Sequence, residues 1–283
     1  MSAVVQHAAP RPRRSGFVVC SICSVAAVVL GSWLWVTQDV GASSAPLISA
    51  ETVQNTLAFG EKLLGRGEAV PAYRDPERWR EAGVLALQTL AMSVMAIAFA
   101  AFGMLATAMV GARQAVEGER SWVGQGLSLL TRGSYILTRA VPELIWAMLI
   151  VFVFSPGVVA GALALGVHNY GVLGRLCAEG VENFDRRPVR AIRSTGAGSG
   201  QTLAYAVLPM LLPGFLTYIL YRWEVIIRTT IVVGAVAAAG LGREFRLRMS
   251  FFHYSDVLLL LIVYVLLVFL VDGLSVFLRR LAR

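Results

Sequence analysis

The sequence contains little lysine, histidine or cysteine, and little charge of any kind. Lys62 is the only lysine, there are three histidines and three cysteines, and charged residues make up 15% of the 283 positions. Disordered chains and disulfide-rich secreted domains need a polar balance or a cysteine count that is absent here. Cys20 and Cys23 lie one helical turn apart in an apolar run, so small buried thiols are a simpler interpretation than a metal or redox pair.

The scarcity of lysine and histidine excludes the common catalytic motifs. A phosphate loop, G-x-x-x-x-G-K-[ST], needs serine or threonine after its lysine, whereas Lys62 is followed by Leu63. His7, His168 and His253 are far apart, and none belongs to an H-x-x-x-H pair or accompanies a nucleophile elbow. We therefore expect that the chain is not an enzyme by itself and holds no metal and no cofactor of its own.

Apolar residues are what the chain has in excess. They make up 57% of it, and the mean hydropathy is +0.69, whereas soluble domains are roughly 45 to 50% apolar. Because ~20 apolar residues cross a bilayer, the apolar runs suffice for about six spans. The sequence predicts an all-α, polytopic membrane protein. The expected spans lie near 16–36, 83–110, 134–154, 158–177, 207–233 and 257–278.

The apolar runs also suggest the organisation of the chain. Val53, Leu57 and Leu64 recur at near-helical spacing in a polar region, which predicts an amphipathic helix on the membrane surface, with an ordinary solvated helix as the alternative. The expected parts are a cytoplasmic N-terminal tail (1–15), an anchor helix (16–37), an extracytoplasmic segment with that amphipathic helix (38–82) and a core domain (83–283).

Arginine placement predicts the orientation of the spans. The formal charge is +8, and the arginines are scattered between apolar runs rather than gathered on one polar face, which disfavours nucleic-acid binding. Cytoplasmic loops carry an excess of arginine. We therefore expect both termini and the 111–133 and 179–206 loops to be cytoplasmic. The 234–256 connection then faces outward, although it carries three arginines.

Polar side chains inside the expected spans are the candidate functional groups, because they are costly in lipid and normally line a cavity or pair with one another. Glu224 and Arg228 are four residues apart and can pair, which leaves Arg222 or part of Arg228 as unneutralised positive charge. Such charge lowers the barrier for an anion, whereas a purely structural network is the alternative. The candidates are Glu143, His168, Asn169, Arg222, Glu224 and Arg228.

The polar piece between residues 185 and 209 carries helix start and stop signals. Pro188 suits the first turn of a helix, Gly196 suits its end, and Leu208-Pro209 suits the start of the next span. These signals predict two short helices at right angles that project from the bundle, with a generic amphipathic loop as the alternative.

This piece resembles the loop of the permease subunit of bacterial type I ABC importers, which follows E-A-A-x3-G-x9-I-x-L-P. Arg190-Ala191-Ile192, Gly196 and Ala206-Val207-Leu208-Pro209 keep that spacing, although Arg190 replaces the loop glutamate. The resemblance implies a type I ABC importer permease (MetI-like) fold in the bacterial plasma membrane. The stretches that resemble the phosphonate branch are Thr89–Met92, Val141–Ala147, Leu163–His168 and Tyr221–Arg228.

The resemblance also implies roles and partners. The chain would pair with a second permease copy, as a homodimer or heterodimer, and would receive a phosphonate or related phosphorus oxyanion from an extracytoplasmic binding protein. Two ATPase subunits would bind ATP and Mg²⁺ and would dock on a coupling loop over 182–206, while the span residues line the path. The implied coupling residues are Pro188, Arg190, Ala191, Arg193, Thr195, Gly196, Ala197 and Pro209, and the implied gate turn holds Gly234, Gly240 and Gly242.

Three other interpretations stay open from the sequence. A proton-coupled secondary carrier would use Glu143, His168 and Glu224 as a relay, and a membrane scaffold would use its charged residues for structure alone. A type I permease for another small solute is the third.

Overall fold

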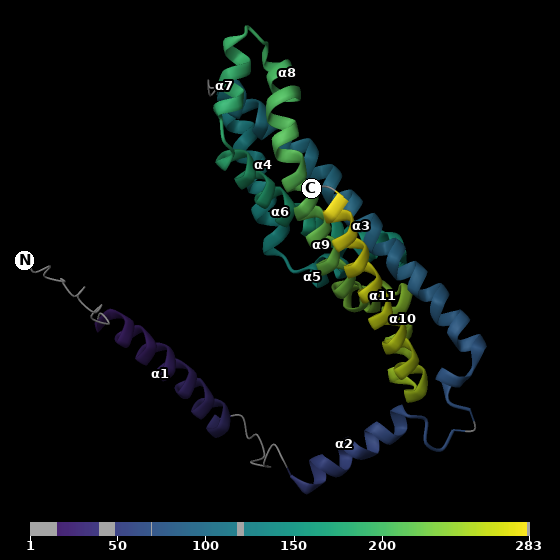
Figure 1. Cartoon of the computed structure of the whole chain (residues 1–283). Helices are drawn as coiled ribbons and strands as arrows, with labels where there is room; N and C mark the ends of the chain where they lie inside the picture. The colour runs from purple at the N-terminus through teal and green to yellow at the C-terminus, as the bar shows by residue number, and fades with distance from the viewer. Residues whose placement is uncertain (1–15, 40–48, 69, 118–121, 282–283) are drawn as a thin grey trace, which may run out of the picture. The chain divides into compact units, whose positions relative to one another are not determined.

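The computed structural model describes residues 16–39, 49–68, 70–117 and 122–281, and over these ranges helices joined by short turns confirm the predicted all-α fold (Figure 1). The chain divides into two units. Met1–Gly60 contains α1 (Gly16–Asp39) and most of α2 (Ala50–Leu63), and Glu61–Arg283 contains the other helices. The predicted N-terminal tail, residues 1–15, lies outside the described residues.

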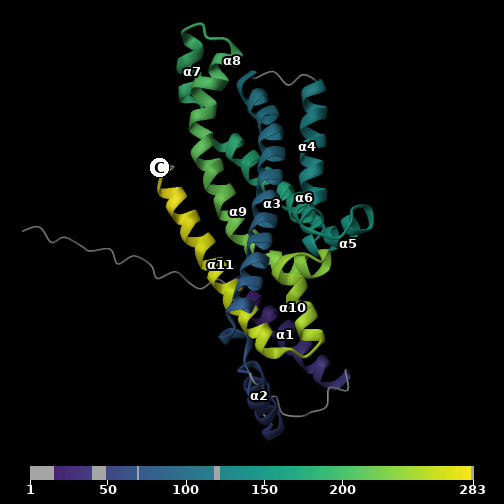
Figure 2. The same ribbon diagram turned by 90° about the vertical axis from the view of Figure 1, so that its right-hand side faces the viewer.

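The second unit is a helical bundle in which a 3₁₀ turn at Ala72–Arg74 precedes the first long helix. Its most buried helix, α6, packs against α3, α4, α5 and α9, and Figure 2 shows α3, α9 and α11 running alongside one another. The helices are α3 (Pro76–Glu117), α4 (Trp122–Ala140), α5 (Glu143–Val153), α6 (Val158–Asn183), α7 (Arg187–Ser194), α8 (Ser199–Thr202), α9 (Leu208–Ala237), α10 (Gly240–Ser250) and α11 (Tyr254–Leu281).

Several helices of the two units are long and apolar enough to cross a membrane. A fifth span is formed if α4 and α5, which meet at a bend of 96°, are counted as one broken span. The bend follows from Pro142, which lacks a backbone N–H and disfavours a helical conformation at Val141. The glycine-rich α6 covers the expected span near 158–177. Among the described residues, the four apolar stretches of sufficient length are Val18–Val36, Pro76–Val110, Ser199–Ala237 and Tyr254–Leu281.

Glycine allows α6 to cross α4 at close range. A Cβ atom on Gly171 would lie 2.8 Å from both the backbone N of Arg139 and the carbonyl O of Tyr135, and a Cβ atom on Gly174 would overlap the Tyr135 ring. Small residues at such crossings are typical of membrane proteins, because they let two helix backbones pack together. These two glycines therefore help to place α6 in the centre of the bundle.

Two segments expected as polar connections are largely helical. Helix α3 continues to Glu117 and α4 begins at Trp122, so most of the 111–133 region belongs to helices. The 234–256 connection contains α10. Arginine is a good helix former, so a basic segment between two spans does not by itself indicate a loop.

Helix α2 lies where the sequence predicts an amphipathic helix. It includes Val53 and Leu57 and ends at Leu63, one residue before Leu64. Its position on a membrane surface and the boundaries of the four predicted parts of the chain stay predictions.

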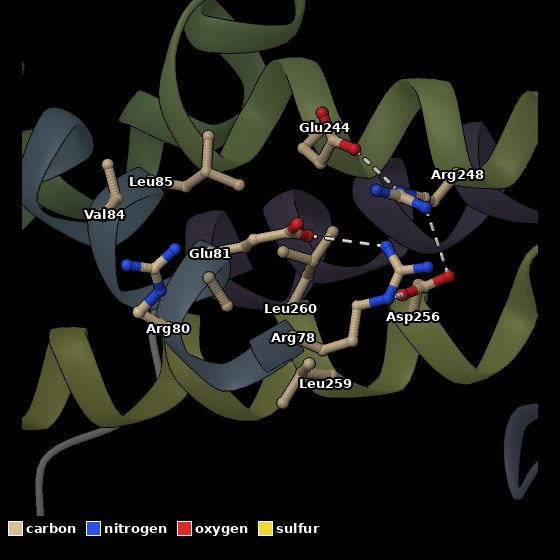
Figure 3. A pocket seen from close by; sticks show the side chains of 11 residues that line it. Arg78, Arg80, Glu81, Val84, Leu85, Glu244, Arg248, Asp256, Leu259 and Leu260 are labelled. Carbon is tan, nitrogen blue, oxygen red and sulfur yellow. Dashed lines mark hydrogen bonds and ion pairs between the residues drawn. The ribbon is translucent and has the colours of Figure 1, made fainter. Parts of the chain in front are cut away.

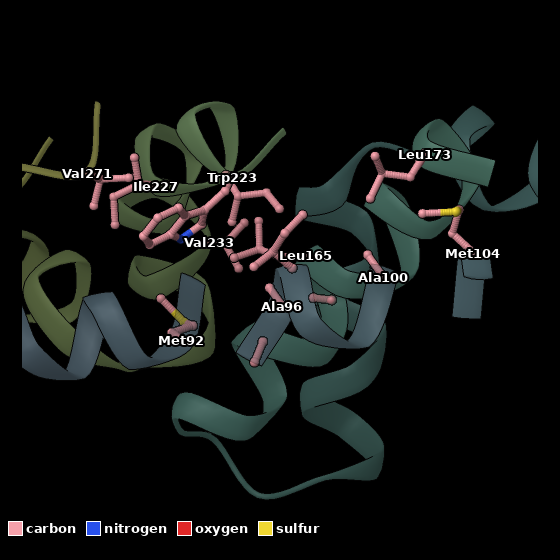
Figure 4. Packing of buried hydrophobic residues seen from close by; sticks show 14 of the residues in the cluster. Met92, Ala96, Ala100, Met104, Leu165, Leu173, Trp223, Ile227, Val233 and Val271 are labelled. Atoms are coloured by element: carbon pink, nitrogen blue, oxygen red, sulfur yellow. The ribbon is translucent and has the colours of Figure 1, made fainter. Parts of the chain in front are cut away.

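Buried apolar side chains from α3, α6, α9 and α11 form the core (Figure 4). Met92, Leu165 and Ile227 are fully buried in it. Trp223 of α9 donates its indole N–H to the hydroxyl of Ser93 in α3 at 3.1 Å. This core fixes α6 and α9 relative to each other, and these two helices carry most of the polar candidates.

Candidate functional site

A polar cluster lies inside the bundle where α5, α6 and α9 meet. Arg222 of α9 donates from Nε at 2.9 Å and from Nη2 at 2.5 Å to Oδ1 of Asn169 in α6. Asn169 is 1% exposed, and its Nδ2 donates to the carbonyl of Leu165 at 2.7 Å. Because Asn169 is itself held on α6, its amide oxygen holds the guanidinium in one orientation.

His168 joins this cluster to the bend between α4 and α5. Its Nδ1 lies 3.0 Å from the carbonyl oxygen of Val141, and its Nε2 lies 3.3 Å from Oε2 of Glu143. A carbonyl oxygen can only accept, so the ring donates from Nδ1. Glu143 is in the first turn of α5, where the helix dipole favours a carboxylate, and it also interacts electrostatically with Arg222. Four of the six span candidates therefore lie together.

The other two span candidates bind α11 rather than each other. Oε1 of Glu224 lies 2.6 Å from Nη1 of Arg279, and Nη2 of Arg228 lies 2.6 Å from Oδ2 of Asp272. The predicted pairing of Glu224 with Arg228 is therefore wrong, because α11 offers each of them an opposite charge. The signal for Asp272 was available in the sequence, since it is an acidic residue inside the last apolar run.

The carboxylates named for a proton relay are divided between these two groups. Glu143 contacts His168, whereas Glu224 contacts Arg279 on the α11 side of α9. Within the part of the chain that the structure describes, no contact connects Glu224 with the Glu143 and His168 pair.

An exposed stripe of α9 runs between the two groups. It comprises the exposed Tyr218, Tyr221, Arg228 and Val232 and the half-buried Val225, which recur every three or four residues and so share one helix face. Tyr221 is exposed, and the Arg228 side chain is 47% exposed. A span face with a guanidinium and two tyrosines is poorly suited to acyl chains, but it suits a water-filled path or a protein partner.

The predicted coupling residues lie at one end of the bundle, in and after α7 (Figure 1). Pro188 is in the first turn of α7, and Gly196 follows the helix with a left-handed φ of +82°. Val189 is 5% exposed and packs against the bundle. The exposed coupling candidates are Arg190, Ala191, Arg193, Thr195 and Gly196, while Ala197 is half-buried.

The second of the two predicted short helices is the first turn of a long one. Helix α8, a π-helical segment (Leu203–Val207) and α9 follow one another without a break from Ser199 to Ala237. Pro209 is in the first turn of α9 and does not interrupt this run. One separate short helix, α7, therefore packs beside the extension of α9 (Figure 2).

The predicted gate turn is buried and tightly packed. Ala238 and Gly240 both have a φ of +56°, and together they reverse the chain between α9 and α10. A Cβ atom on Gly242 would overlap the carbonyl oxygen of Ile231, and one on Gly234 would lie 2.7 Å from the carbonyl oxygen of Ala239. These positions therefore need glycine for close approach of the backbone.

Comparisons with known proteins agree with this architecture. Residues 109–283 match the family model described as binding-protein-dependent transport system inner membrane component. The chain is 35% identical over 254 residues to the phosphite transport system permease protein PtxC of Stutzerimonas stutzeri. That match covers 90% of this chain and 87% of PtxC. It is 34% identical over 172 residues to the phosphate-import permease protein PhnE of Mycolicibacterium smegmatis. That match covers 61% of this chain and 31% of PhnE.

A solved structure shows the same fold. The chain superposes on a chain of the MetNI methionine ABC transporter in an inward-facing conformation with a TM-score of 0.58 and 19% identity, over 70% of this chain and 94% of that one. This likeness confirms the MetI-like fold that the loop spacing implies.

Proposed function

Because the chain belongs to the family of binding-protein-dependent transport system inner membrane components, we propose that it forms the translocation path of an ATP-driven importer for a phosphonate or a related phosphorus oxyanion. PtxC is named for phosphite and PhnE for phosphate, which supports a phosphorus oxyanion as the substrate class. Since the sequence contains no phosphate loop, we assign ATP binding and hydrolysis to a separate ATPase subunit.

The exposed stripe of α9 carries this proposal. Guanidinium groups suit phosphoryl oxygens, because their N–H donors can bind two oxygens at once. Arg228 lies in the stripe and Arg222 lies beside it, where the neutral amide oxygen of Asn169 holds its guanidinium. An anion that reaches Arg228 competes with the carboxylate of Asp272 for the same guanidinium. The path therefore binds the anion by exchanging one partner of Arg228 for another.

A second permease copy completes the path. The side chains of Arg228 and Asp272 are 47% and 32% exposed although they lie in spans. Acyl chains solvate a half-exposed ion pair poorly, so this face needs water or protein against it. Two copies whose α9 stripes face each other would place protein beside this face and enclose water between the stripes. A homodimer and a heterodimer of related permeases would satisfy this requirement equally.

The α7 end of the bundle is the proposed attachment site for the ATPase. The segment 182–206, which contains α7, exposes Arg187, Arg190 and Arg193, while Val189 anchors α7 on the bundle. In the proposed cycle, two ATPase subunits close on ATP and Mg²⁺, pull on α7 and turn the path outward toward the extracytoplasmic binding protein. Hydrolysis then returns the path to the inside. This cycle places α7 and both termini in the cytoplasm, in line with the arginine excess there.

Uptake by the reconstituted importer tests the proposal. Vesicles containing the permease, its ATPase and its binding protein are assayed for ATP-dependent uptake of labelled phosphite, phosphate and a phosphonate. We expect Arg228→Gln to lower uptake about tenfold or more, because it removes the charge that draws an anion into the path. Arg280→Gln, at the exposed end of α11, is the matched control and leaves uptake unchanged.

Two outcomes would contradict the proposal. Substantial ATP hydrolysis by the purified permease alone would show that the chain is not a passive path. Uptake that persists without the ATPase and collapses with the proton gradient would favour the secondary carrier instead.

A further inference from the structure

A charged cavity of about 400 Å³ lies between α3, α10 and the start of α11, at the opposite end of the bundle from α7 (Figures 1 and 3). Neither the α9 stripe nor the α7 region contributes to its lining. Its charged residues are Arg78, Arg80, Glu81, Glu244, Arg248 and Asp256, so three positive and three negative groups face one space.

Asp256 is the centre of these charges. Its Oδ2 lies 3.4 Å from Nη1 of Arg248 in α10, and its Oδ1 lies 3.8 Å from Nε of Arg78 in α3. Each arginine also has a carboxylate on its own helix, Glu244 at 2.7 Å from Arg248 and Glu81 at 3.4 Å from Arg78 (Figure 3). The cavity therefore presents donors and acceptors of full charge in alternation, with no net charge.

The remaining wall is apolar and consists of Ala82, Val84, Leu85, Leu259 and Leu260. In both α3 and α11, the charged residues of the first turns are followed by apolar residues, and the apolar wall begins at this change. The cavity therefore lies at the boundary between water and hydrocarbon.

The apolar wall continues onto the outer surface of α3. Val84 is 53% exposed, and Leu87, one turn further along the helix, is 66% exposed. The cavity therefore opens onto a surface of the kind that contacts acyl chains.

We propose that this cavity binds the head group of a zwitterionic phospholipid of the phosphatidylethanolamine type. Arg78 and Arg248 would bind the phosphate, and Glu81 and Glu244 would accept hydrogen bonds from the ammonium. An acyl chain would follow Val84 toward the lipid-facing surface of α3.

The charges and the wall select this ligand. Balanced charge suits a zwitterion better than an anionic lipid, for which the three carboxylates are repulsive. An ethanolamine ammonium has three N–H donors for the carboxylates, whereas a choline group has none. A soluble aminoalkyl phosphate would fill only the charged half and leave the apolar wall in contact with water. Bound lipid would connect α10 to α3 and α11 and exclude water from the Asp256 ion pairs.

Native mass spectrometry of the full-length chain tests this inference. The protein is equilibrated with equal amounts of phosphatidylethanolamine, phosphatidylglycerol and phosphatidylcholine, and the lipid that stays bound is identified. We expect preferential retention of phosphatidylethanolamine. We also expect the double variant Glu244→Gln/Arg248→Gln to lower that retention about fivefold or more, since it removes two charge-assisted contacts. Arg246→Gln, exposed on the opposite face of α10, is the matched control and keeps the retention of the wild type.

A second variant keeps the test decisive if the double variant fails to fold. Val84→Glu leaves the ion pairs intact but places a charge on the apolar wall, and it should also reduce retention of the lipid. Equal retention of the three lipids, or unchanged retention in Val84→Glu, would overturn the inference. Displacement of the lipid by soluble phosphoethanolamine at equal concentration would show that the apolar wall contributes nothing and would overturn it as well.

Discussion

Arg228 in α9 and Asp272 in α11 form an ion pair with 2.6 Å between Nη2 and Oδ2, and both side chains remain partly exposed. The second carboxylate oxygen of Asp272, Oδ1, is buried without a hydrogen-bond partner among the described residues. Tyr264 of α11 also donates its hydroxyl to the carbonyl of Arg228 at 3.0 Å. The pair thus has two possible roles, since it holds α9 against α11 and also sets the charge of the α9 stripe.

Exchanging the two charges separates these roles. Arg228→Asp or Asp272→Arg alone places like charges together, and we expect each to lower stability by about 1 to 2 kcal/mol, because the pair is only partly buried. The double exchange should restore the melting temperature, because the ion pair forms again. It should not restore uptake, because the guanidinium is then attached to α11 and no longer lies in the α9 stripe. Thermal unfolding and vesicle uptake on the same preparations measure the two effects. Uptake at the wild-type rate by the double variant would show that Arg228 acts only in structure.

The crossing of α4 and α6 predicts a contrast between two glycines of one helix. Gly171→Ala would force a methyl group against the backbone of α4, whereas Gly180→Ala would place it 3.7 Å from the Phe215 ring, an ordinary contact. We expect Gly171→Ala to cost about 1 to 3 kcal/mol of stability. Gly180→Ala should be neutral or stabilise the protein by up to about 1 kcal/mol, because alanine favours helix. Thermal unfolding in lipid checks both, and equal effects would contradict the close crossing.

Thr89 stabilises the turn that joins α9 to α10. Its buried hydroxyl oxygen accepts a hydrogen bond from the backbone N–H of Leu241 at 2.9 Å. Thr89→Val keeps the shape but leaves a buried N–H without a partner, which should cost about 1 to 3 kcal/mol. Thr89→Ser retains the hydroxyl and is the control. Hydrogen exchange at Leu241, measured by mass spectrometry, should rise in the valine variant alone, and unchanged exchange there would argue against this role of Thr89.

The exposed arginines of α7 predict salt-sensitive binding of the ATPase. If Arg187, Arg190 and Arg193 contact an acidic groove, the affinity should fall as ionic strength rises, because salt screens exposed charges. Their combined replacement by Gln should weaken binding and remove most of that dependence. Arg243→Gln, exposed in α10 at the far end of the bundle, is the control. A salt dependence that survives the triple replacement would place the interface elsewhere on the permease.

The sequence was sufficient to predict the all-α class and the apolar helices, but not every helix between them nor the partners of the polar side chains inside the bundle. Hydropathy predicted about six spans, whereas the described residues contain four helices long and apolar enough to cross a membrane, or five with the bent pair of α4 and α5. The rarity of charge in lipid singled out Arg222, Glu224 and Arg228 as candidates. Spacing along one helix then suggested a partner for Glu224, whereas the structure supplies Arg279 from another helix. Such partners depend on how α9 and α11 pack, and local spacing does not encode that.

The bend between α4 and α5 also depends on packing that local sequence does not encode. Pro142 predicts a break in helical hydrogen bonding, but the 96° angle depends on what α5 packs against, including the contacts of His168 with Glu143 and the carbonyl of Val141. The resemblance of the 190–209 spacing to a known loop supplied what composition could not, namely the fold.

The uninterrupted run from Ser199 to Ala237 has a mechanical consequence. Its 39 residues extend for about 58 Å at a helical rise of 1.5 Å per residue, which is nearly twice the ~30 Å thickness of the hydrocarbon layer. Pro213, the fifteenth residue of this run, weakens its backbone hydrogen bonding. Under the proposed coupling at α7, this run would transmit a movement beside α7 to the part of α9 that carries Arg222 and Arg228, with Pro213 as its point of bending.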